Sequence, residues 1–157
     1  MTTPLRAIFE HNGWANEALI EACRGLSPEQ YGTSVVGGYG DLGGTLAHIA
    51  SGEAFYVLLM SGWRPFTRWQ QDDPFPGNVD ELLDVVRETG RRLVEIAEAH
   101  IGREEIERDP GELIPASVIL TQAINHATEH RAQAATILTQ LGIRPPSIDG
   151  WHYGGFE

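Results

Sequence analysis

The sequence predicts an all-α protein, a four-helix bundle with long connections between its helices. Apolar residues recur at helical spacing in four long segments, and no segment alternates apolar and polar residues convincingly enough to predict a strand. The chain has 157 residues, of which 41 % are hydrophobic. This length and composition suit one domain with one core, so residues 1–157 are assigned to a single helical domain.

The first helix is predicted from Pro4 to about Arg24. Thr3 offers a capping hydroxyl, and Pro4 takes the first helical position, where a missing N–H costs no hydrogen bond. The apolar positions that follow at helical spacing are Leu5, Ile8, Phe9, Ala15, Ala18, Leu19 and Ala22. Gly25 ends the helix, and Ser27-Pro28-Glu29 predicts a short extra turn.

The second helix is predicted from Asp41, its capping residue, to about Ser61. The connection at 62–76 contains three prolines and four large aromatic residues, Trp63, Phe66, Trp69 and Phe75. So many aromatic side chains do not suit a solvated loop. We expect them to pack on the bundle or on a partner subunit.

The third helix is predicted to open at Asn78, which has capping-box spacing to Glu81. The fourth is predicted from near Pro115 to Leu141, with Gly142 as its C-terminal cap and Pro145-Pro146 just beyond. The connections between the helices are all long, so the spacing does not force tight up-and-down hairpins.

The charge balance argues against several partners. Eleven Lys and Arg oppose 22 Asp and Glu, for a net charge of −11. Such a surface repels nucleic acid and anionic membranes, so we expect neither as a partner. The sequence has no apolar run of about 18 residues and no secretory signal pattern at its start. A single cysteine, Cys23, agrees with a cytoplasmic location.

Three histidines occupy positions where a helix usually keeps apolar side chains. His126 and His130 are four residues apart on the apolar face of the fourth helix, and His48 lies on that of the second. Gly52, one turn after His48, leaves room where that histidine needs it. Three imidazoles on two inward faces predict one divalent metal site with an open coordination position, and zinc or nickel suits such ligands.

Each histidine also has a simpler interpretation. A single histidine on an apolar face is more often a hydrogen-bonded core residue, and a lone His-x-x-x-His recurs by chance. His11, His100 and His152 are interpreted as ordinary helix-edge, helix-end and tail residues. A closed structural site needs a fourth protein ligand, for which the candidates are Glu53, Asp149 and His152. Cys23 is interpreted as structural, because a helix C-terminus disfavours a thiolate.

At these residues the chain resembles the DinB/YfiT-like superfamily of metal-dependent proteins. The matching stretches are Asn12-Gly13-Trp14-Ala15-Asn16, Leu46-Ala47-His48-Ile49 with Glu53, Asn125-His126, His130-Arg131-Ala132-Gln133, and Leu141-Gly142-Ile143-Arg144-Pro145-Pro146. The resemblance implies a four-helix bundle of unusual connectivity, a divalent metal on His48, His126 and His130, and frequently a homodimer. Some relatives are transferases or isomerases that use thiols such as bacillithiol or mycothiol.

Three functions stay open, all with a small-molecule ligand. A thiol-dependent S-transferase comes first, and a metal-dependent hydrolase of small esters or amides comes second. The third is a metal-binding dimer without catalysis. His126 to His130 also matches H-x-x-E-H, a peptidase signature with Glu129 as general base, but such short motifs match by accident. Arg131 could contact a thiol cofactor, although a solvated arginine on the helix surface is the simpler expectation.

Overall fold

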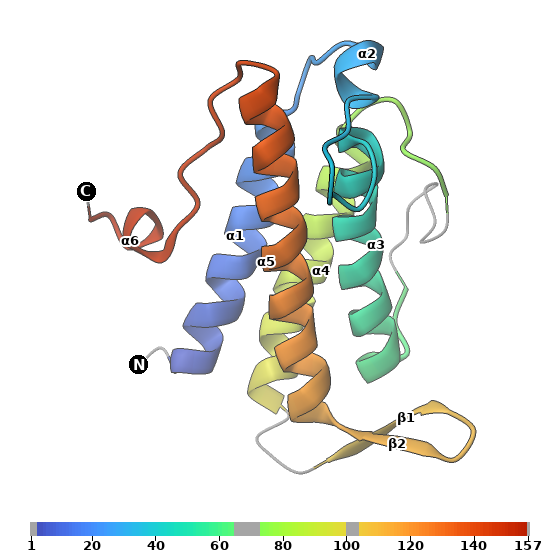
Figure 1. Ribbon diagram of the computed structural model, residues 1–157. Helices are drawn as coiled ribbons and strands as arrows, with labels where there is room; N and C mark the ends of the chain where they lie inside the picture. The colour runs from blue at the N-terminus through green and yellow to red at the C-terminus, as the bar shows by residue number, and fades with distance from the viewer. Residues whose placement is uncertain (1–2, 65–72, 100–103, 157) are drawn as a thin grey trace.

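Four long helices form a bundle in the computed structural model, which describes residues 3–64, 73–99 and 104–156. They are α1 (Pro4–Ala22), α3 (Leu42–Ser61), α4 (Asp80–Ala99) and α5 (Ala116–Gln140), and the short helices are α2 (Pro28–Tyr31) and α6 (Gly150–Tyr153). Helix α1 packs on α4 and α5, and α3 packs on the same two helices. Helices α1 and α5 run in one direction and α3 and α4 in the other (Figure 1). The predicted four-helix bundle is therefore confirmed.

The predicted helix ends are confirmed within about two residues, because local caps determine them. The Thr3 side chain accepts a hydrogen bond from the Arg6 N–H at 3.1 Å, and Asp41 accepts one from Gly44 at 2.7 Å. At the far end of α5, Gly142 has a φ of +74°, the left-handed conformation that a glycine adopts readily. Helix α4 starts later than predicted, at Asp80, whose N–H bonds to the Asn78 side chain.

A short β-hairpin contradicts the prediction that the chain has no strand. Strand β1 (Glu105–Asp109) pairs antiparallel with β2 (Glu112–Pro115) between α4 and α5, at one end of the bundle (Figure 1). Ile106 and Ile114 are partners across the two strands and pack against the core. The turn runs through Gly111, whose φ is +82°. The hairpin covers only these two apolar side chains, and both are only partly buried. Its alternation is therefore faint in the sequence.

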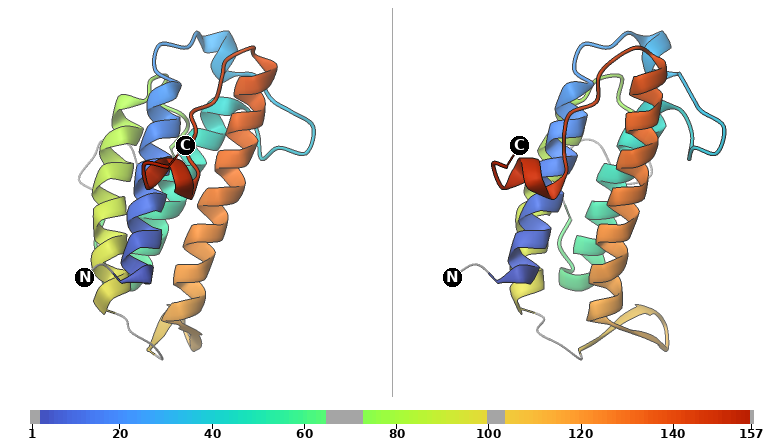
Figure 2. Two further views of the ribbon diagram at one scale, coloured as in Figure 1. Left: turned by 90° about the vertical axis from the view of Figure 1, so that its left-hand side faces the viewer. Right: turned by 60° about the vertical axis from the view of Figure 1, so that its left-hand side comes forward.

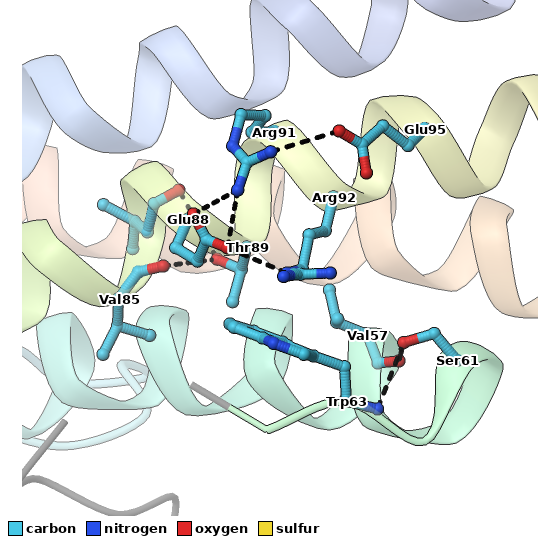
Figure 3. A network of polar contacts seen from close by, with 10 residues as sticks. Val57, Ser61, Trp63, Val85, Glu88, Thr89, Arg91, Arg92 and Glu95 are labelled. Atoms are coloured by element: carbon cyan, nitrogen blue, oxygen red, sulfur yellow. Dashed lines mark hydrogen bonds and ion pairs between the residues drawn. The ribbon is translucent and has the colours of Figure 1, made fainter. Parts of the chain in front are cut away.

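The connection after α3 packs on the bundle where it is described. Arg92 of α4 lies over the Trp63 ring, 3.9 Å from its centroid, and is held by Glu88 at 2.9 Å (Figure 3). Phe75 packs against Tyr31, with 4.5 Å between ring centroids. Both aromatics therefore pack as predicted, whereas Phe66 and Trp69 lie outside the described residues.

The buried apolar side chains form two clusters, one toward each end of the bundle. The first includes Leu19, Leu46 and Leu138, and the second includes Phe9, Val57 and Ile119. The four helices carry buried polar residues between these two groups, among them Asn12, Glu53, Thr89, His130 and Arg131. The middle of the bundle is therefore a polar layer, and it contains the candidate site.

No helix in the described part of the chain combines the length and the apolar character that crossing a membrane requires. The C-terminal segment returns along the bundle and places α6 across α1 (Figure 2). There the His11 ring lies 5.5 Å from that of Tyr153, and its Nε2 is 2.9 Å from the Ile148 carbonyl oxygen.

Candidate metal centre

The three predicted histidines converge in the polar layer. His48 comes from α3, and His126 and His130 come from adjacent turns of α5. One ligand atom from each lies within 4.8 Å of the other two. The Nε2 atoms of His48 and His126 are 3.0 Å apart. The inward direction predicted for all three side chains, and their convergence, are confirmed.

Gly52 makes room for a different histidine from the one predicted. A Cβ atom at this position would lie 2.3 Å from Cε1 of His126 and 2.8 Å from its Nδ1. The glycine therefore accommodates the ring of His126 from the neighbouring helix and not that of His48 on its own helix. One residue without a side chain lets α3 and α5 approach closely enough for their imidazoles to meet.

The two histidines that face each other are kept neutral. Burial, reinforced by the positive charge that His130 would carry, lowers the pKa of His48. Burial and the two neighbouring imidazoles lower the pKa of His126 to about 4. At neutral pH both rings therefore present lone pairs, the form in which imidazole binds a metal.

A cavity of about 580 Å³ opens beside the histidines. Its described lining includes His48, His126 and four aromatic side chains, those of Tyr39, Phe55, Tyr56 and Phe75. None of the described lining residues is Lys or Arg, and Asp73 is the acidic residue among them. The described lining thus offers apolar and aromatic surface to a small molecule.

The other candidate ligands do not join this group within the described residues. The Glu53 carboxylate accepts hydrogen bonds from Asn12, Asn16 and Thr89 instead. Asp149 and His152 belong to α6, where Asp149 caps the helix. The three histidines are thus the only group of three or more potential metal ligands in the described part of the chain. An open coordination position remains the better interpretation.

Further residues singled out in the sequence have other surroundings. Cys23 is fully buried, its thiol donates to the Leu19 carbonyl, and burial raises its pKa to about 12, so it is structural as predicted. Glu129 is exposed and does not line the cavity, which argues against the peptidase interpretation of H-x-x-E-H. His100 lies outside the described residues.

A second polar cluster lies in the same layer, and the expectation of a solvated Arg131 is wrong. Arg131 is buried, and its guanidinium donates to the side-chain oxygens of Asn12 and Asn16 at 2.7 and 2.6 Å. The amide groups of the same two asparagines donate to Glu53 at 2.8 and 2.7 Å. Burial raises the pKa of Glu53 to about 7 and lowers that of Arg131 to about 10.

The helical spacing does not predict this cluster, although Asn12, Asn16, Glu53 and Arg131 all stand in the stretches that resemble DinB/YfiT-like proteins. Asn12 and Asn16 are four residues apart on α1 and therefore share one face of the helix. Both are fully or almost fully buried among apolar neighbours such as Ala15 and Leu19. An i, i+4 pair of asparagines on an apolar face is a signal of a buried polar partner, which here comes from α3 and α5.

The donor set of the histidine group fits a divalent transition metal. On a tetrahedral ion with metal–nitrogen distances of about 2.0–2.1 Å, two imidazole nitrogens lie roughly 3.4 Å apart. The 3.0 Å between the Nε2 atoms of His48 and His126 is close to that spacing. Neutral nitrogen ligands suit zinc, nickel, copper or iron, so the ligands alone do not select one metal.

Comparisons with known proteins agree with this architecture. The model of the DinB family matches residues 1–155. Among solved structures, the chain is similar to a DinB-like protein from Bacillus cereus ATCC 10987, with 20 % sequence identity and a TM-score of 0.65. That similarity covers 87 % of this chain and 90 % of the other, and it concerns the fold alone. No curated protein matches the sequence.

Proposed function

The chain belongs to the DinB family, and we propose that it is a metal-dependent enzyme in which His48, His126 and His130 hold one divalent ion. The observation that carries this proposal is the position of the three imidazoles. They converge within 4.8 Å, and two of them line a cavity of about 580 Å³. Structural zinc sites are closed by four protein ligands, whereas catalytic sites have three and an open position.

The reaction we propose is the transfer of a small thiol to an electrophile. A divalent metal on neutral ligands lowers the pKa of a thiol or water that binds it. In the transfer, the thiol sulfur bonds to an electrophilic carbon, the leaving group departs with the bonding electron pair, and the thiol proton passes to water. The thiol interpretation itself rests on the family resemblance.

The residues of the cavity have roles that follow from their chemistry. The aromatic side chains of Tyr39, Phe55, Tyr56 and Phe75 offer apolar surface to a substrate and exclude water from the space beside the histidines. Arg131 is excluded as a contact for the thiol, because its guanidinium is occupied within the buried cluster. A thiol without carboxylates suits the cavity better than one that carries them.

A hydrolase is the second candidate, and the composition of the cavity favours it in one respect. The described lining contains no Lys or Arg, so a neutral ester or amide fits without an unpaired charge. The same ion would then act on water and not on a thiol. This candidate requires no cofactor.

Spectroscopy with thiols distinguishes the transferase from the hydrolase. The cobalt- or nickel-substituted protein should change its absorption when mycothiol, bacillithiol or a simpler thiol is added at submillimolar concentration. Unchanged spectra with every thiol, together with metal-dependent cleavage of simple esters or amides, would overturn the transferase in favour of the hydrolase. Metal binding with neither response would favour a binding protein without catalysis.

We also propose that the chain forms a homodimer. Two aromatic side chains near the C-terminus, Trp151 and Phe156, are 74 % and 64 % exposed, and Val118 on α5 is 54 % exposed. The rings of Trp151 and Phe156 lie 6.2 Å apart and form one exposed aromatic pair, and aromatic residues are enriched at interfaces. The family resemblance also implies a homodimer. Light scattering at micromolar concentration should give twice the 17.3 kDa of one chain, and a monomer mass would refute the dimer.

A further inference from the structure

Gln133 of α5 touches both the third histidine and the loop that covers the site. Its side-chain oxygen lies 2.8 Å from Nδ1 of His130 and 3.2 Å from the backbone nitrogen of Tyr39. Gln133 follows His130 by three residues, so the two side chains share one face of the helix. One amide oxygen thus joins a candidate metal ligand to a loop that is far away in the sequence.

The contact of Gln133 with the Tyr39 backbone determines how Gln133 can bond to His130. A backbone N–H can only donate, so the Gln133 atom that faces Tyr39 is its carbonyl oxygen, an acceptor. The same oxygen can only accept from His130, which must therefore carry its hydrogen on Nδ1. In the neutral ring the lone pair is then on Nε2, the nitrogen left free to bind a metal.

The Tyr39 ring packs on two of the three histidines. Its ring is stacked on that of His48, with 3.8 Å between centroids and 12° between planes, and it meets the His130 ring edge-on at 5.2 Å. Tyr39 also lines the cavity. The position of its ring therefore affects two of the three imidazoles and the space available to a ligand.

The loop that carries Tyr39 is fixed mainly at its base. Leu42 N–H donates to Thr33 at 2.9 Å, and Ser34 and Asp41 form an isolated bridge. Beyond this base, Val36 is fully exposed, and Gly37 has a φ of +83°. Val35 packs against the apolar core. The bond from Tyr39 to Gln133 and the stacking on His48 attach the tip of the loop to α5 and α3.

We propose that Gln133 is a positioning residue: it holds Nε2 of His130 toward the other two imidazoles and fastens Tyr39 over the site. This inference rests on the proposed metal site, and it adds Gln133 to the residues that build that site. Tyr39 is then a wall of the ligand pocket, and its position depends on the residue that orients the metal ligand. Loss of such outer contacts typically costs 10–100-fold in metal affinity.

Cobalt titration of metal-free, untagged protein tests the proposal. Gln133→Leu should bind cobalt(II) about 10–100-fold more weakly than the wild type, with an altered absorption spectrum. Gln133→Glu restores an acceptor and should recover most of the affinity. Gln140→Leu, the same change at an exposed position of α5, is the matched control and should bind like the wild type. Tyr39→Leu should alter the spectrum, whereas Tyr39→Phe should not.

A second measurement needs no metal. Nitrogen-15 spectra of the metal-free protein should show the His130 hydrogen on Nδ1 in the wild type and a mixture of tautomers in Gln133→Leu. Wild-type affinity and spectrum in Gln133→Leu, or a His130 hydrogen on Nε2 in the wild type, would overturn the proposal. If the wild type binds no cobalt, the proposed function fails, and the His130 tautomer then decides the positioning role alone.

Discussion

The polar layer of the bundle contains two clusters that differ in how completely their polar atoms are paired. In the cluster of Asn12, Asn16, Glu53 and Arg131, both charged groups are bonded to the same two asparagines. In the histidine group, Nε2 of His48 and Nε2 of His126 share one hydrogen bond of 3.0 Å, but Nδ1 of His126 is buried without a partner among the described residues. The first cluster is closed, and the second opens on a cavity.

Because of this difference, one cluster is expected to stabilise the protein and the other to bind a ligand. A paired buried cluster ties helices together and is costly to break, because a lone charge remains inside. A group of converging donors with few partners gains little for the fold and is suited to an incoming ligand. The histidine group is therefore expected to govern metal binding, and the Glu53 cluster to govern the free energy of unfolding.

The largest expected effect is on stability. Glu53→Ala leaves the Arg131 guanidinium buried without its acid, so the free energy of unfolding should fall by about 3–5 kcal/mol. Glu129→Ala removes an exposed glutamate on α5 and should change it by less than about 0.5 kcal/mol. Urea denaturation measures both. Equal stability of the two variants would contradict the role of the closed cluster.

The next effect is on metal affinity. His126→Ala removes one of three ligands. Loss of a residue that only supports a ligand costs up to about 100-fold in metal affinity, so loss of the ligand itself should cost at least as much. His48→Ala and His130→Ala should behave alike, whereas His152→Ala, in the exposed α6, should bind metal normally. Cobalt titration gives the constants. A His48 variant with full affinity would show that α3 takes no part in the site.

A smaller effect is expected where the two clusters share a helix. Gly52→Ala would place a Cβ 2.3 Å from the His126 ring, so the ring must move. We expect a loss of about 1–3 kcal/mol in stability, typical of overpacking, together with weaker cobalt binding. Gly13→Ala is the matched helical control, since its Cβ would meet Gly90 at an ordinary 3.4 Å. A Gly52 variant with unchanged cobalt affinity would contradict the close approach.

The last effects concern pH, and the two clusters should give opposite signs. In the metal-free protein, the pKa of His126 is about 4, below the ordinary 6.5, so its contribution to stability is present above pH 6.5 and is lost as the pH falls toward 4. The pKa of Glu53 is about 7, above the ordinary 4.5, so its contribution is present below pH 4.5 and is lost as the pH rises through 7.

Two variants separate these contributions. Relative to the wild type, His126→Gln should gain in urea midpoint as the pH falls from 7 to 4.5, and Glu53→Gln should gain as the pH rises over the same interval. Differences that do not change with pH, or that change with the same sign in both variants, would contradict the assignment of the two clusters.

The sequence predicts what depends on helical periodicity and misses what depends on contacts between helices. The long helices and the inward direction of His48, His126 and His130 follow from spacing along one helix. The burial of Arg131 does not, because its partners are two asparagines on α1. Likewise, Gly52 proves to face His126 only once α3 and α5 are packed together.

The hairpin and the first turns of α1 are two further places where the sequence pattern and the structure differ. Strands β1 and β2 are short, and the Asp109-Pro110-Gly111 turn was the clearest local signal for them. The helical spacing predicts Leu5 and Ile8 on the apolar face of the first helix, yet they are 36 % and 47 % exposed. Near the end of a bundle, apolar residues at helical spacing continue past the point where the neighbouring helices can cover them.

Metal analysis of the untagged protein tests the central claim most directly. Elemental analysis after purification, or after addition of zinc or nickel and removal of the excess, should give about one divalent ion per chain, because the three imidazoles form one site. The triple variant of His48, His126 and His130 to alanine should give none. A wild-type protein that is purified without metal and that also fails to take up zinc and nickel would contradict the account.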